Sequence, residues 1–396
     1  MKLAQRTFDI PGSETLAVTA KAAALRAKGL DVIGFGAGEP DFATPAHIVA
    51  AAKRALDDGW TRYTPSQGSP KLISAICDHM AKHFALECAP NEVMTSVGGK
   101  HALYNAVMCL ANPGDEVLLP APYWVTYPVQ CTMAGARAVV VPAGADTGFR
   151  VTVEALEKAT TAATRGLILN SPSNPTGAGY REEDLLAIAD FVKRRDLWVL
   201  SDEMYARLVY DGYTSRFFAT LPGMRERTVT VYGLSKTYAM TGWRVGITVA
   251  PAELTEAMNR VQGQVTSNIA AVCQAAAIAA LAEPDDFLAG WVAEFDQRRR
   301  FMVSRLNAIE GVSCNLPEGA FYAFPDFGEL LGRRYGDKVM ATDWDLIDYF
   351  LAEAQVALVP GTPFGAPGFA RLSYATSMAN IEKGLSRMET AISRLS

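Results

Sequence analysis

The stretch from Val231 to Gly246 constrains this chain most, because it places a single lysine between two strand-like segments. The first segment, Val229 to Tyr232, is apolar and β-branched and breaks at Gly233. A turn of small residues then presents Lys236, and a second strand-like run begins at Gly246. A lysine in such apolar surroundings is held out of water, which favours its neutral amine. We therefore expect Lys236 to act as a nucleophile.

Arg244 follows the lysine by eight positions and suits a phosphate group, because its planar guanidinium can donate two parallel hydrogen bonds. A neutral amine condenses with an aldehyde to form a Schiff base. A lysine of this kind beside a phosphate-binding arginine meets two requirements of pyridoxal 5'-phosphate (PLP). The alternative is a surface loop with two unrelated cations, since most charged residues are exposed.

Composition limits the class of protein. The chain has 396 residues, of which 49% are hydrophobic and 20% charged, so it can form two domains with sizeable cores. Its net charge of -5 argues against nucleic acid as the main partner. The N-terminus lacks a signal-peptide core, and the longest apolar run, 269–282, is too short to span a bilayer. We expect no membrane association, no metal site among the scattered cysteines and histidines, and a cytoplasmic location.

Seven strand-like segments follow one another along the chain, with helical patterns between most of them. They begin at Glu92, Glu116, Ala138, Gly166, Trp198, Val229 and Gly246. This order predicts an α/β fold with an open, mostly parallel sheet and helices on both faces. We expect residues 46–284 to form this large domain. Residues 1–45 and 285–396 would form a smaller α+β domain, with strands near 312–315 and 321–324.

A basic run, Gln297 to Arg300, falls near the middle of a long helical pattern that extends from Asp285 to about Ala308. Runs of this kind usually lie on a solvated helix face, and that is the interpretation we adopt.

Several loops contain residues that suit an anionic ligand. Gly98 and Gly99 separate a strand from a helix, where exposed backbone N–H groups meet the positive end of the helix dipole. A plain tight turn would explain the same glycines. Asp202 ends a buried strand, where a carboxylate is costly unless it is paired. Ligands of α/β sheets bind at this edge.

The glycines at positions 34, 36 and 38 do not form a dinucleotide-binding loop, because Glu39-Pro40 stands where a helix should open. A turn whose backbone comes close to a ligand fits these residues better.

Together these segments resemble the class I aminotransferases, which are PLP enzymes of fold type I, and most closely the bacterial aspartate aminotransferases. The likeness covers nearly the whole chain and implies that Lys236 holds PLP and moves the substrate's Cα proton, while Asp202 contacts the ring nitrogen. The other implied cofactor-binding residues are Gly98, Gly99, Lys100, Trp124, Asn174, Tyr205, Arg244 and Tyr63.

The resemblance also implies the substrates, an L-amino acid and a 2-oxo acid such as 2-oxoglutarate. Arg371 and the Gly38 amide would bind the α-carboxylate, near Trp124 and Asn174. Lys100 would bind the distal carboxylate of an acidic donor, or else contribute only its backbone to the phosphate loop. Tyr63 would reach the partner's phosphate in a homodimer, or else be an amphipathic surface tyrosine.

Two departures from the family pattern bear on this interpretation. Residues 10–13, Ile-Pro-Gly-Ser, lack the lysine that relatives using prephenate carry, which puts prephenate use in doubt. Gly233 stands where some relatives have a phosphate-binding serine. The expected donor is aspartate or another acidic or aromatic amino acid. The alternative functions are a PLP lyase of the same fold, which needs no 2-oxo acid acceptor, and an aromatic or prephenate aminotransferase. A PLP-sensing module of a transcription regulator would need a DNA-binding segment, and we find none.

Overall fold

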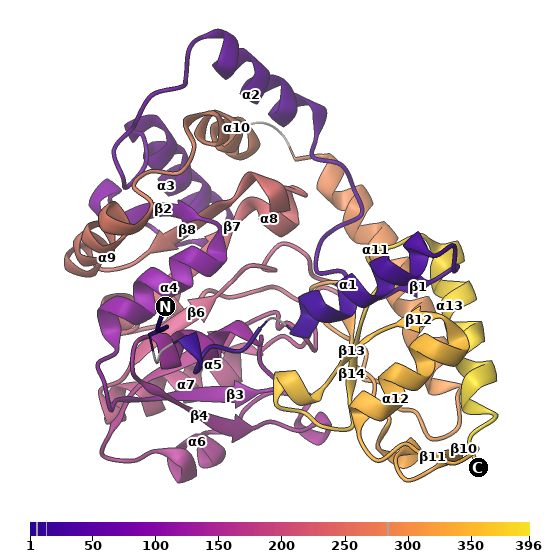
Figure 1. Cartoon of the computed structure of the whole chain (residues 1–396). Helices are drawn as coiled ribbons and strands as arrows, with labels where there is room; N and C mark the ends of the chain where they lie inside the picture. Colours follow the sequence, from indigo (N-terminus) through magenta and orange to yellow (C-terminus); the bar gives the residue numbers. More distant parts are fainter. Residues whose placement is uncertain (5–6, 13, 283–284) are drawn as a thin grey trace.

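The fold is built on one seven-stranded sheet with a second, smaller body beside it (Figure 1). The computed structural model describes residues 1–4, 7–12, 14–282 and 285–396. The sheet has the strand order β2-β8-β7-β6-β5-β3-β4, and only β8 runs antiparallel to its neighbours. The predicted mostly parallel sheet is thus confirmed. Its strands are β2 Val93–Val97, β3 Glu116–Ala121, β4 Arg137–Pro142, β5 Thr164–Asn170, β6 Trp198–Asp202, β7 Thr228–Gly233 and β8 Val245–Val249.

Helices cover both faces of this sheet because side chains of its central strands alternate between two apolar cores. Ile168 and Leu200 pack with α4, α5 and α9 on one face. Leu167 and Val199 pack with α6 and α7 on the other, where α3 and α10 continue the layer. The helices of the first face are α4 Gly99–Leu110, α5 Thr126–Met133 and α9 Ala252–Val265; those of the second are α3 Pro70–Phe84, α6 Val153–Ala159, α7 Glu182–Arg195 and α10 Ala271–Ala282.

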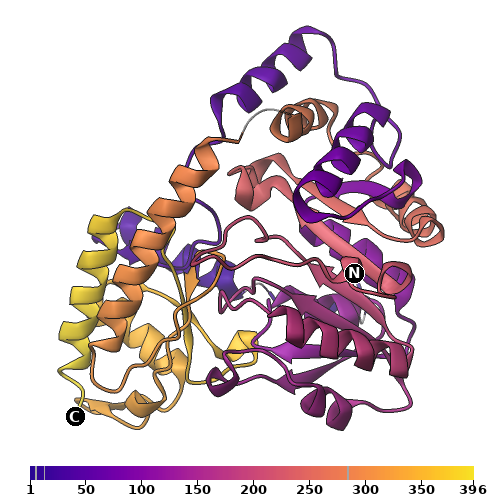
Figure 2. The ribbon, with the colours of Figure 1, turned by 180° about the vertical axis from the view of Figure 1, so that it is seen from behind.

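The smaller body contains short strands and long helices around its own core. The α11 and α13 helices, orange and yellow in Figure 2, pack side by side along it. Helix α2 (Ala46–Asp57) instead packs on α10 of the large body. The strands of the smaller body are β1 Ile33–Gly34, β9 Tyr322–Ala323, β10 Arg334–Tyr335, β11 Lys338–Val339, β12 Val356–Ala357, β13 Val359–Pro360 and β14 Ala370–Ser373; its helices are α1 Glu14–Ala27, α11 Phe287–Asn307, α12 Asp343–Tyr349 and α13 Met378–Ile392.

Among the described residues, no helix combines the length and the apolar character needed to cross a bilayer.

One predicted strand is wrong. Residues 312–315 form a single β-bridge, between Ser313 and Asp326, in place of a strand. The ladder stops there because both backbone groups of Cys314 bond to a side chain. Its N–H donates to Asn307 Oδ1, and its carbonyl accepts from Asn307 Nδ2.

The basic run on α11 is also not a solvated face. Of its three arginines, Arg298 and Arg299 are buried and Arg300 is exposed. Arg299 donates to Asp211, Asp296 and the Pro317 carbonyl, so each nitrogen of its guanidinium has a carboxylate or carbonyl acceptor. The pattern failed as a predictor because these acidic partners lie on distant loops as well as on the same helix.

This ion cluster yields a matched pair of substitutions. Arg299→Ala should lower the free energy of unfolding by about 2–4 kcal/mol, because it empties the space of a fully buried side chain and leaves the Pro317 carbonyl without its donor. Arg300→Ala, which removes an exposed arginine that pairs with the same two aspartates, should change stability little. Urea unfolding of both variants measures the difference, and equal losses would show that Arg299 acts as a surface residue.

Candidate active site

The site lies at one edge of the large sheet, where the carboxyl ends of β2, β5, β6 and β7 meet. Because β8 is antiparallel, its amino end reaches the same edge, and Val245 pairs with Val97. Asn170 and Asp202 are the last residues of adjacent strands and stand in register. Lys236 lies in α8 (Leu234–Thr237), directly after β7. Residues far apart in sequence are therefore neighbours for topological reasons.

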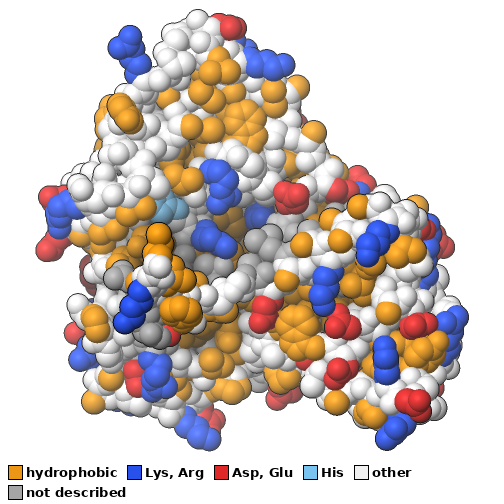
Figure 3. Space-filling view, viewed as in Figure 1, with side chains coloured by type: hydrophobic (Ala, Val, Ile, Leu, Met, Phe, Trp, Pro, Cys, Tyr) orange, Lys and Arg blue, Asp and Glu red, His pale blue; other side chains and the backbone are white. Residues whose placement is uncertain are grey.

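A pocket of about 480 Å³ opens at this edge between the two bodies. Figure 3 shows basic side chains in the hollow at the centre of the molecule. Four of the lining residues are basic and two are acidic, so the pocket favours anionic ligands. The lining is Gly36, Ala37, Gly38, Glu39, Gly99, Lys100, Leu103, Trp124, Tyr127, Asn170, Asn174, Asp202, Met204, Tyr205, Ser235, Lys236, Thr241, Arg244, Tyr322 and Arg371.

Lys236, which the sequence predicted to be a poorly hydrated nucleophile, lines the pocket. Its Nζ donates to the Gly38 carbonyl at 2.5 Å and lies 6.0 Å from the centre of the Phe321 ring. Burial lowers the pKa of its amine from 10.5 to about 8, and the positive charge of Arg371 acts in the same direction. A substantial neutral fraction is therefore present near physiological pH.

Asp202 is buried and accepts two hydrogen bonds that fix both of its oxygens. The Tyr127 hydroxyl donates to Oδ2 at 2.8 Å, and the Met204 amide donates to Oδ1 at 3.1 Å. Burial raises the pKa of this carboxyl from 3.8 to about 6, while the Tyr127 and Met204 hydrogen bonds and the Lys236 charge oppose that rise. A cationic partner inside the pocket would therefore stabilise the ionised form of this carboxylate.

Gly98, Gly99 and Arg244 meet at the start of α4, where the first backbone N–H groups have no partner within the helix. A Cβ at Gly98 would lie 2.3 Å from Arg244 Nη2, so only a glycine lets the guanidinium approach this closely. Arg244 itself is positioned by donating to the Thr241 carbonyl at 2.9 Å. Amides, a helix dipole and a guanidinium together form a site suited to phosphate.

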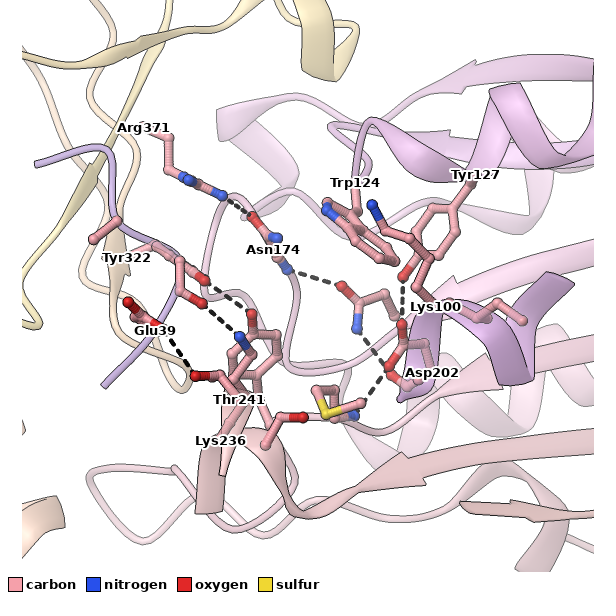
Figure 4. Close-up of a pocket in the computed structure, with 18 of the residues that line it drawn as sticks. Glu39, Lys100, Trp124, Tyr127, Asn174, Asp202, Lys236, Thr241, Tyr322 and Arg371 are labelled. Carbon is pink, nitrogen blue, oxygen red and sulfur yellow. Dashed lines mark hydrogen bonds between the residues drawn. The ribbon is translucent and has the colours of Figure 1, made fainter. Parts of the chain in front are cut away.

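Lys100 and Trp124 lie together on the large-body side of the pocket (Figure 4). Lys100 Nζ is 5.1 Å from the centre of the Trp124 ring, within the range of a cation–π contact. Burial lowers the pKa of Lys100, with a further contribution from Arg244. The side chain thus enters the pocket, as its suggested substrate role requires.

Arg371 lies across the pocket, on β14 of the smaller body (Figure 4). Nη1 donates to Asn174 Oδ1 at 2.9 Å and Nη2 donates to the Gly36 carbonyl at 3.0 Å. Its Cζ atom lies 4.6 Å from the centre of the Tyr322 ring and 5.3 Å from the centre of the Phe364 ring, within the range of cation–π contacts. No carboxylate within 4 Å pairs with this buried cation among the described residues, which leaves it available to an anionic ligand.

Tyr205 joins the pocket from the loop after β6, and its hydroxyl lies 2.9 Å from that of Tyr322. The structure thus brings eleven of the twelve predicted site residues to this region. The exception is Tyr63, whose side chain is 91% exposed and lies outside the pocket lining.

Sequence reasoning missed several lining residues, among them Tyr127, Asn170 and Tyr322. Tyr127 could have been found, because it lies three positions after Trp124 at the start of a helix. Tyr322 carried no signal as an aromatic residue in an apolar strand. The Gly233 departure has a structural counterpart: a Cβ there would lie 2.8 Å from Met204 Cε, so the methionine fills the space that a serine side chain would need.

Comparison with known proteins identifies the family. The family model for aminotransferase class I and II matches residues 30–388. The chain therefore belongs to this family and is an aminotransferase, as the sequence resemblance implied.

Named relatives agree with this assignment. The chain is 46% identical to an aspartate/prephenate aminotransferase from Cereibacter sphaeroides, over 97% of each chain. It is 44% identical to an aspartate aminotransferase from Rhizobium meliloti, over 99% of this chain and 97% of the relative. The crystal structure of an aspartate aminotransferase from Rhizobium meliloti superposes with a TM-score of 0.97 at 43% identity, covering both chains fully. The structure of an aspartate aminotransferase from Thermus thermophilus with maleate superposes with a TM-score of 0.93 at 37% identity, over 99% of this chain and 100% of the other.

The pocket also fits the family's cofactor by its own chemistry. PLP carries a phosphate, a ring nitrogen that can be protonated and an aldehyde. The start of α4 and Arg244 suit the phosphate. Buried Asp202 suits the protonated ring nitrogen, and the poorly hydrated amine of Lys236 suits the aldehyde. No residue of the pocket conflicts with this ligand.

Glu203, beside Asp202, supports a prediction of pH dependence. It is 1% exposed, Ser201 donates to its Oε1 at 2.6 Å, and burial raises its pKa from 4.5 to about 8. The stability that its protonated form contributes is complete below pH 4.5 and is lost as the pH rises through about 8. Glu203→Gln cannot ionise, so it should be more stable than the parent at pH 8.5, by about 2–4 kcal/mol, and similar at pH 5.

Thermal unfolding at several pH values measures this effect. Glu183→Gln, at a glutamate whose side chain is 76% exposed, serves as the control and should shift stability little at any pH. Parallel pH profiles for the parent and Glu203→Gln would contradict the assignment.

Proposed function

We propose that this aminotransferase binds PLP in the pocket and transfers the amino group of an acidic L-amino acid, such as aspartate, to a 2-oxo acid such as 2-oxoglutarate. The observation that supports this most is that Lys236 and Asp202 line one pocket whose cations outnumber its acids. Aspartate, glutamate and 2-oxoglutarate all carry two carboxylates, and Arg371 and Lys100 are basic groups on opposite sides of the pocket (Figure 4).

The residues would take the roles that the family resemblance implies. Asp202 would hold the ring nitrogen in its protonated form, because a buried carboxylate favours a cationic neighbour. Gly98, Gly99 and Arg244 would bind the phosphate, Trp124 would stack on the ring, and Asn174 and Tyr205 would contact the phenolic oxygen. PLP, when bound, withdraws electrons from the substrate's Cα and so makes its proton acidic.

Lys236 would then transfer that proton. Its Nζ accepts the proton from Cα as a general base and returns it as a general acid, which its pKa of about 8 permits in both directions near neutral pH. Arg371 and the Gly38 amide would hold the α-carboxylate, so that the Cα–H bond stays beside Nζ. The contact between Nζ and the Gly38 carbonyl supports this role, because it brings the amine close to Gly38.

Prephenate or another aromatic substrate is the second candidate, because the Cereibacter relative is named for aspartate and prephenate. Against it, Pro11 and Gly12 occupy the stretch in which such relatives have a lysine. Ser13, the last residue of that stretch, lies outside the described residues. The lyase alternative has no comparable support, since the family and the named relatives are aminotransferases.

We further propose a cytoplasmic homodimer with a large domain over 46–284 and a small domain over 1–45 and 285–396. The division is supported by an apolar core made mostly of residues of the small domain, into which residues 204–210 of the large domain also pack. Residues 283 and 284, next to the proposed boundary, lie outside the described residues. The six cysteines are free thiols, as is usual in a reducing compartment. The exposure of Tyr63 fits a residue that completes the phosphate site of a partner subunit.

A panel of amino donors against 2-oxoglutarate tests the function. Aspartate and glutamate should be the best donors, and Lys236→Ala should abolish turnover with every donor. Lys100→Ala should lower kcat/KM for acidic donors by roughly tenfold to a hundredfold and leave neutral donors nearly unchanged, because it removes one charge-assisted hydrogen bond. Equal losses for both donor classes would restrict Lys100 to the phosphate loop, and product formation without an acceptor would indicate a lyase.

Mixing two impaired variants tests the dimer, at a PLP concentration too low to saturate the Tyr63 variant. Tyr63→Phe should weaken cofactor binding by roughly tenfold, the effect of losing one hydrogen bond to a charged group. A hybrid of Lys236→Ala with Tyr63→Ala should regain activity, since one of its two sites would have both native residues. A monomer in sedimentation, or no recovery on mixing, would contradict the role of Tyr63.

A further inference from the structure

Tyr322 connects the two sides of the pocket. It lies on β9 of the smaller body, is fully buried, and pairs across the sheet with Ser373, two positions beyond Arg371. Its hydroxyl meets the Tyr205 hydroxyl of the large body at 2.9 Å. Figure 4 shows Tyr322 beside Arg371, on the far side of the pocket from Trp124.

The ring and the hydroxyl of Tyr322 make separate contacts. The centre of the ring lies 4.6 Å from Arg371 Cζ, so the ring makes a cation–π contact with that guanidinium, as does Phe364 at 5.3 Å. The hydroxyl contacts Tyr205 and lies near Gly38, where a Cβ would be 3.6 Å away. One side chain thus touches the residues that we assign to the α-carboxylate and to the phenolic oxygen of the cofactor.

We propose that Tyr322 is a positioning residue whose hydroxyl donates to Tyr205 and so directs the single Tyr205 proton into the pocket, while its ring keeps Arg371 in place. This inference rests on the proposed function, because it assigns a task to residues already placed at the cofactor and substrate.

The 2.9 Å contact between the two hydroxyls allows either one to donate, and the proposed direction follows from counting protons. Each phenol has one proton, so only one of the two can donate in the bond between them. If Tyr322 donates, Tyr205 keeps its proton for the pocket, and accepting a hydrogen bond makes it a stronger donor. Burial raises the pKa of both hydroxyls, so both keep their protons over the working pH range.

The proposal has a spectroscopic consequence. A stronger donor at Tyr205 stabilises the anionic form of the cofactor's phenolic oxygen and lowers the pH at which the absorbance of the bound cofactor changes. Removing the Tyr322 hydroxyl should therefore move that transition to higher pH. A role in packing alone would leave the transition where it is.

The experiment compares purified, cofactor-loaded parent with Tyr322→Phe, Tyr205→Phe and the double variant. Tyr322→Phe should raise the midpoint of the absorbance transition by about half a pH unit and lower kcat roughly threefold to tenfold, as expected for one hydrogen bond. KM for the amino donor should stay within about twofold, because the ring still supports Arg371. Tyr322→Leu, which lacks the ring, should raise KM as well.

Two controls separate the possible failures. In the double variant, loss of the Tyr322 hydroxyl should shift the transition no further than Tyr205→Phe alone, since the proposed effect passes through Tyr205. Tyr374→Phe removes a buried hydroxyl of the same core, outside the pocket. It should change neither the midpoint of the absorbance transition nor kcat.

Two results would overturn the inference and leave the proposed function intact. One is that Tyr322→Phe does not shift the absorbance transition. The other is that it shifts the transition as much in the Tyr205→Phe variant as in the parent. A parent protein that binds no PLP would overturn the proposed function itself.

Discussion

The site depends on the cost of keeping Lys236 and Asp202 away from water. An ammonium and a carboxylate lose hydration when buried, and hydrogen bonds within the protein replace only part of it. The result is a lysine that gives up its proton easily and an aspartate that gains from a cationic partner. A cofactor with an aldehyde and a basic ring nitrogen suits both groups at once.

The topology of the sheet makes this arrangement possible. Parallel strands bring Asn170 and Asp202 to one edge, and the antiparallel β8 brings Arg244 to the same edge from the opposite chain direction. The close approach of Arg244 to the start of α4 depends on Gly98. The close approach of β8 to the same point depends on Gly246, where a Cβ would lie 2.4 Å from the Gly98 carbonyl carbon. The phosphate region is thus shaped by backbone contacts more than by side chains.

Local sequence patterns predicted the strands, their functional edge and the chemistry of the lysine segment. The resemblance to a known family, and not a local pattern, implied most of the individual site residues, such as Trp124, Asn174 and Arg371. Residues that act through distant partners could not be predicted in this way. Arg299 looks solvated in sequence because Asp211 is 88 positions away, and Tyr322 looks like core because Tyr205 is 117 positions away. Both contacts exist only once the two bodies are packed together.

Chemical trapping of the cofactor on the protein tests the central claim most directly. Borohydride reduction of the PLP-loaded protein, followed by peptide mass spectrometry, should find the cofactor fixed on the peptide that contains Lys236. Label on Lys100 or another lysine, or no stoichiometric label at all, would contradict the claim that the buried amine after β7 holds the cofactor.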